Sequence, residues 1–164
     1  MALPSKILPG FSATLYAQPG ASPTALTTSA LSTYASVSAL AVSGNLVPVE
    51  AIPAFGQDDA VASFGVAGSR QSDKIPVQSA PTSMSITAAW NPSDAVLLLL
   101  RADAYNGTID RTFVISATDG TGIVNYAFNG RVSQWTIDSA PGAEAKVTFT
   151  IHPRGNQYGW SNSV

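Results

Sequence analysis

Hydrophobic and polar residues alternate along several short stretches of the chain, most strictly near its C-terminal end. Between Lys146 and Ile151 the apolar residues Val147, Phe149 and Ile151 are separated by threonines. A period of two places alternate side chains on opposite faces of a strand, one buried and one exposed. We expect this strand to end at Pro153, which cannot donate to a ladder. The same pattern predicts strands at 11–18, 37–42, 46–52, 60–66, 82–90, 110–118 and 123–137.

One stretch, at about 92–105, follows a helical pattern instead. Asn91 is a favourable N-cap, and Pro92 suits the first helical position, where its missing N–H costs nothing. Asn106-Gly107 supplies a C-terminal stop, because glycine readily takes the left-handed conformation that ends many helices. These signals predict a single helix of about four turns.

The leucines of this predicted helix do not all lie on one face. Leu97 and Leu100 share a face with Ala104, whereas Leu98 and Leu99 point elsewhere. The helix is therefore apolar on more than one side. Either a deep groove within the subunit or a contact with another subunit would bury the second side.

The order of these elements predicts a mainly β fold. We expect a two-sheet antiparallel β-sandwich or barrel-like domain with one helix on its flank, formed by residues 1–164 as a single domain. The segment at about 19–45 is rich in Ser, Thr and Ala and carries Pro19, Gly20 and Pro23, so it is interpreted as a loop or extension.

Charge is unusually scarce in this chain. Only 11% of its residues are Asp, Glu, Lys or Arg, against roughly 25% in an average soluble protein. Isolated domains are usually kept soluble by charge, whereas interface cores are depleted in it. The composition favours a subunit covered by its neighbours over a small Ser/Thr-rich secreted module. The net charge is −2 and the eight cations are scattered, so stable binding to nucleic acid is not expected.

The sequence offers no convincing catalytic, cofactor-binding or metal-binding set. There is no cysteine, and His152 is the only histidine, expected to lie on a strand surface. No nucleophile elbow, Walker A loop or dinucleotide-binding glycine turn is present. The longest aliphatic run, Val96–Leu100, is too short to cross a bilayer, and the N-terminus lacks a signal-peptide pattern. We therefore expect neither an enzyme nor a membrane partner, and folding in a cytoplasm.

Three stretches carry a resemblance to a known family. The first is Phe64–Pro76, a strand with a polar loop; the second is Met84–Asp94, a strand leading to Asn-Pro-Ser-Asp and a Leu-rich helix. The third joins Tyr126–Val132 to Val147–Pro153 through a Pro-Gly turn. In order and spacing, they resemble the tail tube proteins (major tail proteins) of long-tailed bacteriophages. Residues 19–45 have no counterpart in that pattern.

The resemblance implies a structural subunit of a virion tail, assembled in the host cytoplasm. Six subunits would form a ring, with their sheets joined into one inner barrel, and the stacked rings would form the channel for DNA delivery. The implied partners are copies of the chain itself and other tail proteins (terminator, tape measure, sheath or baseplate), with DNA passing transiently and no cofactor.

Candidate contact residues follow from the pattern and the resemblance together. The polar loop contributes Arg70, Gln71, Asp73 and Lys74, the helix contributes Leu98 and Leu99, and the C-terminal segment contributes Tyr158 and Trp160. We expect all of them at contacts between subunits or rings.

Two other classes of protein stay open at this point. A monomeric carbohydrate-binding β-sandwich would use exposed aromatic residues, for which Trp90, Trp135 and Trp160 are candidates, although the first two lie in predicted strands typical of a core. A hydrolase would need acidic residues such as Asp103, Asp110 and Asp119, which are few and dispersed.

Overall fold

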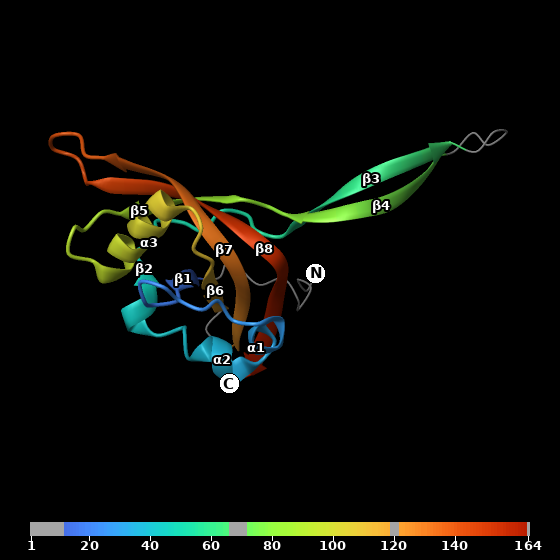
Figure 1. Cartoon of the computed structure of the whole chain (residues 1–164), viewed down its shortest axis with the longest axis horizontal. Coiled ribbons are helices and arrows are strands. Elements are labelled where there is room, and N and C mark those ends of the chain that lie inside the picture. Colours follow the sequence, from blue (N-terminus) through green and yellow to red (C-terminus); the bar gives the residue numbers. More distant parts are fainter. Residues whose placement is uncertain (1–11, 66–71, 119–121, 164) are drawn as a thin grey trace, which may run out of the picture.

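One curled antiparallel sheet forms the body of the protein (Figure 1). The computed structural model describes residues 12–65, 72–118 and 122–163. The order of strands across the sheet is β2-β1-β6-β7-β8-β5. Their bounds are β1 (Ser12–Ala17), β2 (Leu46–Val47), β5 (Met84–Ala89), β6 (Arg111–Thr118), β7 (Gly122–Asp138) and β8 (Lys146–Ser163). The sheet curls like half a barrel, and its long β7–β8 hairpin runs from one end of the body to the other.

The mainly β class with one flanking helix is confirmed, but the predicted sandwich of two sheets is wrong. The two remaining strands, β3 (Gln57–Gly65) and β4 (Ser72–Pro81), pair with each other as an antiparallel hairpin. This hairpin, called the arm from here on, projects away from the body (Figure 1). Alternation reveals which face of a strand is buried but not what covers it, and here helix α3 (Ala95–Asn106) takes the place of a second sheet.

The main core lies between the sheet and α3. Leu97 and Leu100 of the helix are fully buried, in agreement with the helical spacing in the sequence. Burying each leucine contributes roughly 1.5–3 kcal/mol. The sheet supplies the alternating side chains of its inner face: Leu15, Ala17, Met84, Ile86, Ala88, Phe113, Ile115, Phe128, Val132, Val147, Phe149 and Ile151.

Helix α3 begins at Ala95 and not at the predicted position Pro92. The carboxylate of Asp94 accepts hydrogen bonds from the N–H groups of Val96 (2.9 Å) and Leu97 (3.1 Å), so Asp94 is the N-cap. Asn91 instead accepts a bond from the Ser93 N–H at 2.9 Å and forms a turn before the helix. The predicted stop is confirmed, since Gly107 is left-handed with φ 68°.

Two strand predictions near the N-terminus are wrong. Residues 37–42 form no strand; Tyr34–Ser38 is a short helix, α2, after another, α1 (Thr28–Leu31). The strand predicted at 46–52 shrinks to β2, preceded by the 3₁₀ turn η1 (Ser43–Asn45), and Pro48 follows it directly. Val49 adds one isolated bridge to Ala88.

The predicted end of the last strand at Pro153 is also wrong, because β8 continues to Ser163. Strand β5 pairs with β8 only as far as Ile151. Pro153 therefore lies where one side of β8 has no ladder that its missing N–H would interrupt.

The segment predicted as a Ser/Thr/Ala-rich loop or extension packs on the second face of the sheet. Leu31 and Val37 form a small buried cluster with Val114 and Ala127. A polar anchor adds to it: Asn129 donates to the Leu26 carbonyl at 2.8 Å, and the Thr112 hydroxyl accepts from the Leu26 N–H at 2.9 Å. Both faces of β6 and β7 are thus covered within one subunit.

A buried ion pair joins helix, sheet and N-terminal strand. Arg111 Nε lies 2.5 Å from Asp103 Oδ2, and the two side chains are 1% and 2% exposed. The guanidinium also donates to the backbone carbonyls of Gln18 and Gly20, just after β1. The positive charge of Arg111 is therefore compensated by Asp103, and its N–H groups donate to three different residues.

We expect Arg111→Met to lower the free energy of unfolding by about 3–5 kcal/mol, because Asp103 would stay buried without its counter-ion. Urea unfolding at neutral pH measures this loss. Arg101→Met is the matched control: Arg101 is exposed on α3 and stacks on Tyr105, so its loss should stay under about 1 kcal/mol. Equal losses for the two variants would contradict a structural role for the buried pair.

Candidate assembly surfaces

The β7–β8 hairpin is longer than the strands beside it. Strand β6 pairs with β7 from Ile123 to Gly130, and β5 pairs with β8 from Lys146 to Ile151. Residues 153–163 of β8 therefore have β7 on one side and no described strand on the other. A strand edge of this kind presents unpaired N–H and C=O groups and is a template for pairing with another chain.

The opposite edge of the sheet is also only partly covered. Strand β1 pairs with β6 along its whole length, but β2 covers only Leu15 and Tyr16 on its other side. The half of the sheet made by β1, β6, β7 and the distal part of β8 thus has four antiparallel strands; among the described strands, its β8 edge has no neighbour and its β1 edge is only partly covered.

The outer face of β5, β7 and β8 carries several hydroxyl groups. Thr150 donates to Gln134 Oε1 at 2.9 Å, and the hydroxyls of Thr87 and Thr148 lie 3.4 Å apart. His152 is exposed on this face, as predicted. Its Nδ1 lies 2.9 Å from Ser83 Oγ and its Nε2 lies 2.7 Å from Ser133 Oγ. Since Ser83 follows β4 closely, His152 ties the root of the arm to β7.

An arginine cluster, defined as Arg131, Asp110 and Arg154, lies beside this joint. Arg131 Nε donates to Asp110 Oδ1 at 2.6 Å, and Arg154 Nη1 donates to Asp110 Oδ2 at 2.8 Å. The hydrogen bond from Arg131 lowers the pKa of Asp110, partial burial opposes that effect, and the bond from Arg154 lowers it further. The same bond raises the pKa of Arg131. Two cations thus share one carboxylate.

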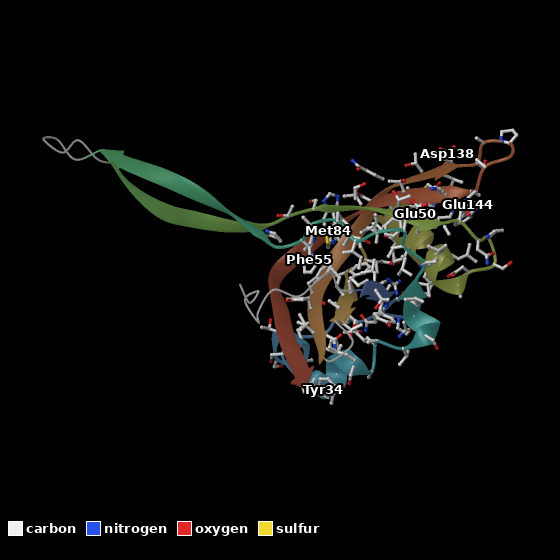
Figure 2. All side chains as sticks on the ribbon, turned by 180° about the vertical axis from the view of Figure 1, so that it is seen from behind. Tyr34, Glu50, Phe55, Met84, Asp138 and Glu144 are labelled. Atoms are coloured by element: carbon white, nitrogen blue, oxygen red, sulfur yellow. The ribbon has the colours of Figure 1, made fainter. Side chains whose placement is uncertain are left out.

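Negatively charged side chains gather at the turn between β7 and β8. Lys146 forms an ion pair with Glu50, and that hydrogen bond raises the pKa of Lys146, with weaker support from Glu144 and Asp138. Figure 2 shows Glu50, Asp138 and Glu144 together at this end of the molecule, opposite the arm. We call these three residues, with Lys146, the acidic turn.

The predicted contact residues lie in three separate regions. Asp73 and Lys74 are at the far end of β4, paired with Phe64 and Ser63, whereas Arg70 and Gln71 lie outside the described residues. Tyr158 and Trp160 lie on the uncovered part of β8, opposite Ala127 and Asn125. On α3, Leu98 is 42% exposed and Leu99 is half-buried. The structure therefore spreads these residues over the arm, the β8 edge and the helix.

The arginine cluster was not predicted from the sequence. Arg131 stands opposite His152 in the β7–β8 ladder, but Asp110 reaches it from the residue before β6. Strand register would have been needed to bring Asp110 and Arg154 together, and no spacing in the sequence encodes it.

The residues considered for other functions are used in packing and pairing. Trp135 stacks on Phe149 with ring centroids 5.4 Å apart, and Trp90 meets Trp135 edge to face at 5.8 Å. Asp103 and Asp110 are held by arginines, and Asp119 lies outside the described residues. Across residues 12–65, 72–118 and 122–163, no three histidine or acidic side chains gather as a metal-binding group. None of the helices described there has the length and apolar composition needed to cross a membrane.

Comparison with solved structures identifies the fold. A chain of the anti-feeding prophage (AFP) baseplate matches with a TM-score of 0.67 at 9% identity, covering 98% of this chain and 97% of that one. The SPP1 tail tube matches with a TM-score of 0.54 at 12% identity, covering 93% and 77%. The tail of the empty GTA particle matches with a TM-score of 0.50 at 12% identity, covering 71% and 87%. No protein-family model and no curated protein matches the sequence.

The chain therefore has the fold found in phage tail tubes and in the baseplate of a related tail-like particle. The resemblance drawn from its three sequence stretches is confirmed at the level of the fold. At these identities the likeness carries no residue-level equivalence.

We expect the stabilising effect of Asp110 to disappear in acid. Its pKa is lowered in the folded protein, so its contribution is present above the unfolded value, about pH 4, and is lost as the pH falls below that. Asp110→Asn should cost up to about 1 kcal/mol at pH 7, because the cluster is partly exposed, and less at pH 3. Urea unfolding at both pH values gives the two differences; an unchanged difference would contradict the ion-pair account.

We expect Leu98→Asp to leave the subunit folded, because Leu98 is 42% exposed, and to reduce its association. Leu97→Asp is the matched control, one position away and fully buried, and it should unfold the domain or cost more than about 3 kcal/mol. Circular dichroism reports the fold and sedimentation velocity reports the association. Unchanged association of a folded Leu98→Asp variant would remove this helix from the interface.

Proposed function

We propose that this chain is the structural subunit of a phage-type tail tube and has no enzymatic role. Copies would form rings of six, the number that the family resemblance implies, and the rings would stack into a channel for DNA delivery. The subunit would be located in the tail of a virion that is assembled in the host cytoplasm. The observation that carries the proposal is the fold match over nearly the whole chain to a tail tube and a tail-like baseplate.

The open strand edges supply a physical reason for ring formation. In the four-stranded half of the sheet, β1 and β8 lie at opposite sides and run antiparallel to each other, because three antiparallel pairings separate them. When β8 of one copy lies beside β1 of the next, the alternation of strand direction continues across the boundary. A ring of copies would close these edges into one barrel, which removes the exposed backbone groups.

The arm provides a means of joining one ring to another. At about 3.3 Å per residue, a strand of the length of β4 extends roughly 30 Å, well beyond the body of its own subunit (Figure 1). It would carry Asp73 and Lys74 to a neighbouring subunit, where they would make two of the predicted contacts; the contacts predicted for Arg70 and Gln71 concern residues outside the described part of the chain. At the ends of the tube, other tail proteins such as a terminator, tape measure, sheath or baseplate would meet the same surfaces.

The weak charge of the chain suits a DNA channel. A net charge of −2 gives the subunit as a whole little attraction to phosphate, so DNA would pass without being held. The carbohydrate-binding alternative is disfavoured, because Trp90 and Trp135 pack against each other and Phe149 and do not form an exposed stacking platform.

Removing the arm tests this proposal. The arm leaves the body at adjacent points, since the Thr82 N–H donates to the Gly56 carbonyl at 3.1 Å, so residues 57–81 can be replaced by a short Gly-Ser turn. We expect the wild-type protein to form rings and tubes in negative-stain micrographs, and the armless variant to stay folded without forming tubes. Circular dichroism and urea unfolding check that the body is intact.

A wild-type protein that stays monomeric at high concentration in sedimentation velocity would contradict the tube function. An armless variant that forms tubes as long as those of the wild type would contradict only the role given to the arm.

A further inference from the structure

The subunit carries opposite charges at two places along its long axis. The acidic turn lies at one end, and the arm extends from the body toward the other (Figures 1 and 2). The arginine cluster lies at the root of the arm, because Arg131 stands opposite His152 and His152 binds Ser83 just after β4. The acidic turn and the arginine cluster therefore lie at different positions along the β7–β8 hairpin.

The arginine cluster has more donors than its single carboxylate can accept. Arg131 uses Nε and Nη2 toward Asp110, and Arg154 uses only Nη1. The remaining guanidinium N–H groups have no partner among the described residues, and the two arginines are 37% and 55% exposed. A guanidinium offers a planar set of donors that matches a carboxylate, so the cluster can accept a second one.

The acidic turn has the opposite imbalance. Lys146 is the one cation among three carboxylates, and its ion pair is with Glu50. Asp138 and Glu144 are exposed and contribute only longer-range attraction to Lys146. They are free to pair with a cation from outside the subunit.

This pairing has to take place between two molecules. Arg131 and Asp138 belong to the same strand, and at about 3.3 Å per residue they are roughly 20 Å apart. The turn cannot fold back onto the cluster while β7 and β8 stay paired. A second copy, shifted along the long axis toward the arm, would bring its own acidic turn under the arm and toward the arm root.

We propose that the acidic turn of one copy, through Asp138 and Glu144, docks on the arginine cluster of a second copy. The inference rests on the proposed function, because it describes how stacked subunits would engage. The contact is head-to-tail and shifts each copy along the long axis, so its repetition gives an open filament. It also fixes the direction of stacking, since two acidic turns or two arginine clusters facing each other would repel.

Charge reversal with rescue tests the docking. In the full-length protein, Arg154→Glu alone and Glu144→Lys alone should each raise the protein concentration needed for tube formation about tenfold, measured by pelleting and negative-stain microscopy. The double variant Arg154→Glu with Glu144→Lys, or Arg154→Glu with Asp138→Lys, should return it to within about threefold of wild type. Such rescue between reversed partners is the signature of a direct pair.

A mismatched pair serves as the control. Arg101→Glu reverses an exposed arginine on α3, outside the cluster, and combining it with Glu144→Lys should give no rescue. Circular dichroism and urea unfolding confirm that each variant keeps its fold. Raising the salt concentration should weaken wild-type tubes and leave less difference between wild type and the single variants.

The outcomes separate the two proposals. If wild-type protein forms tubes and neither paired reversal rescues assembly, the docking is wrong and the tube function stands. If Arg154→Glu leaves assembly unchanged but abolishes binding of a short DNA duplex, the cluster binds phosphate and the docking is wrong. If wild-type protein forms no rings or tubes at all, both proposals fail.

Discussion

The structure depends on a mismatch of strand lengths. Strands β7 and β8 contain 17 and 18 residues, whereas the flanking strands β6 and β5 contain 8 and 6. Every backbone N–H and C=O group needs a partner or water. Among the described strands, the short neighbours cover opposite halves of the hairpin, so residues 153–163 of β8 have β7 as their single strand neighbour. An edge of this length is usually avoided or protected in a protein that works alone.

The other elements hold this open sheet in one shape. Helix α3 covers its inner face, the short helices α1 and α2 cover part of the other, and the Asp103–Arg111 pair connects helix, sheet and the chain after β1. A buried pair contributes little net stability compared with apolar residues, but leaving either partner unpaired is costly. Within one subunit, these contacts therefore hold α3, the sheet and the chain after β1 in one arrangement.

The sequence predicted local features better than their partners. Alternation located most of the strands but missed β4, and the spacing of Leu97 and Leu100 identified the buried side of the helix, because both follow from local geometry. The number of sheets did not follow, since a buried strand face looks the same under a helix as under another sheet. Asp94 replaced Asn91 as the N-cap because both can cap and only the tertiary fold selects one. The arginine cluster depends on register between distant strands, and that information is spread over the whole chain.

The bond network around His152 has a mechanical consequence. Its ring joins Ser83, at the base of the arm, to Ser133 on β7, near the bulge at residues 133–136 where Gln134 takes a positive φ of 56°. The direction of the arm is therefore linked to the local bend of the hairpin. If subunits stack as proposed, bending of the sheet in one subunit would act through this joint on the direction of its arm. The two hydrogen bonds of the imidazole thus couple the orientation of the arm to that of the β7–β8 hairpin.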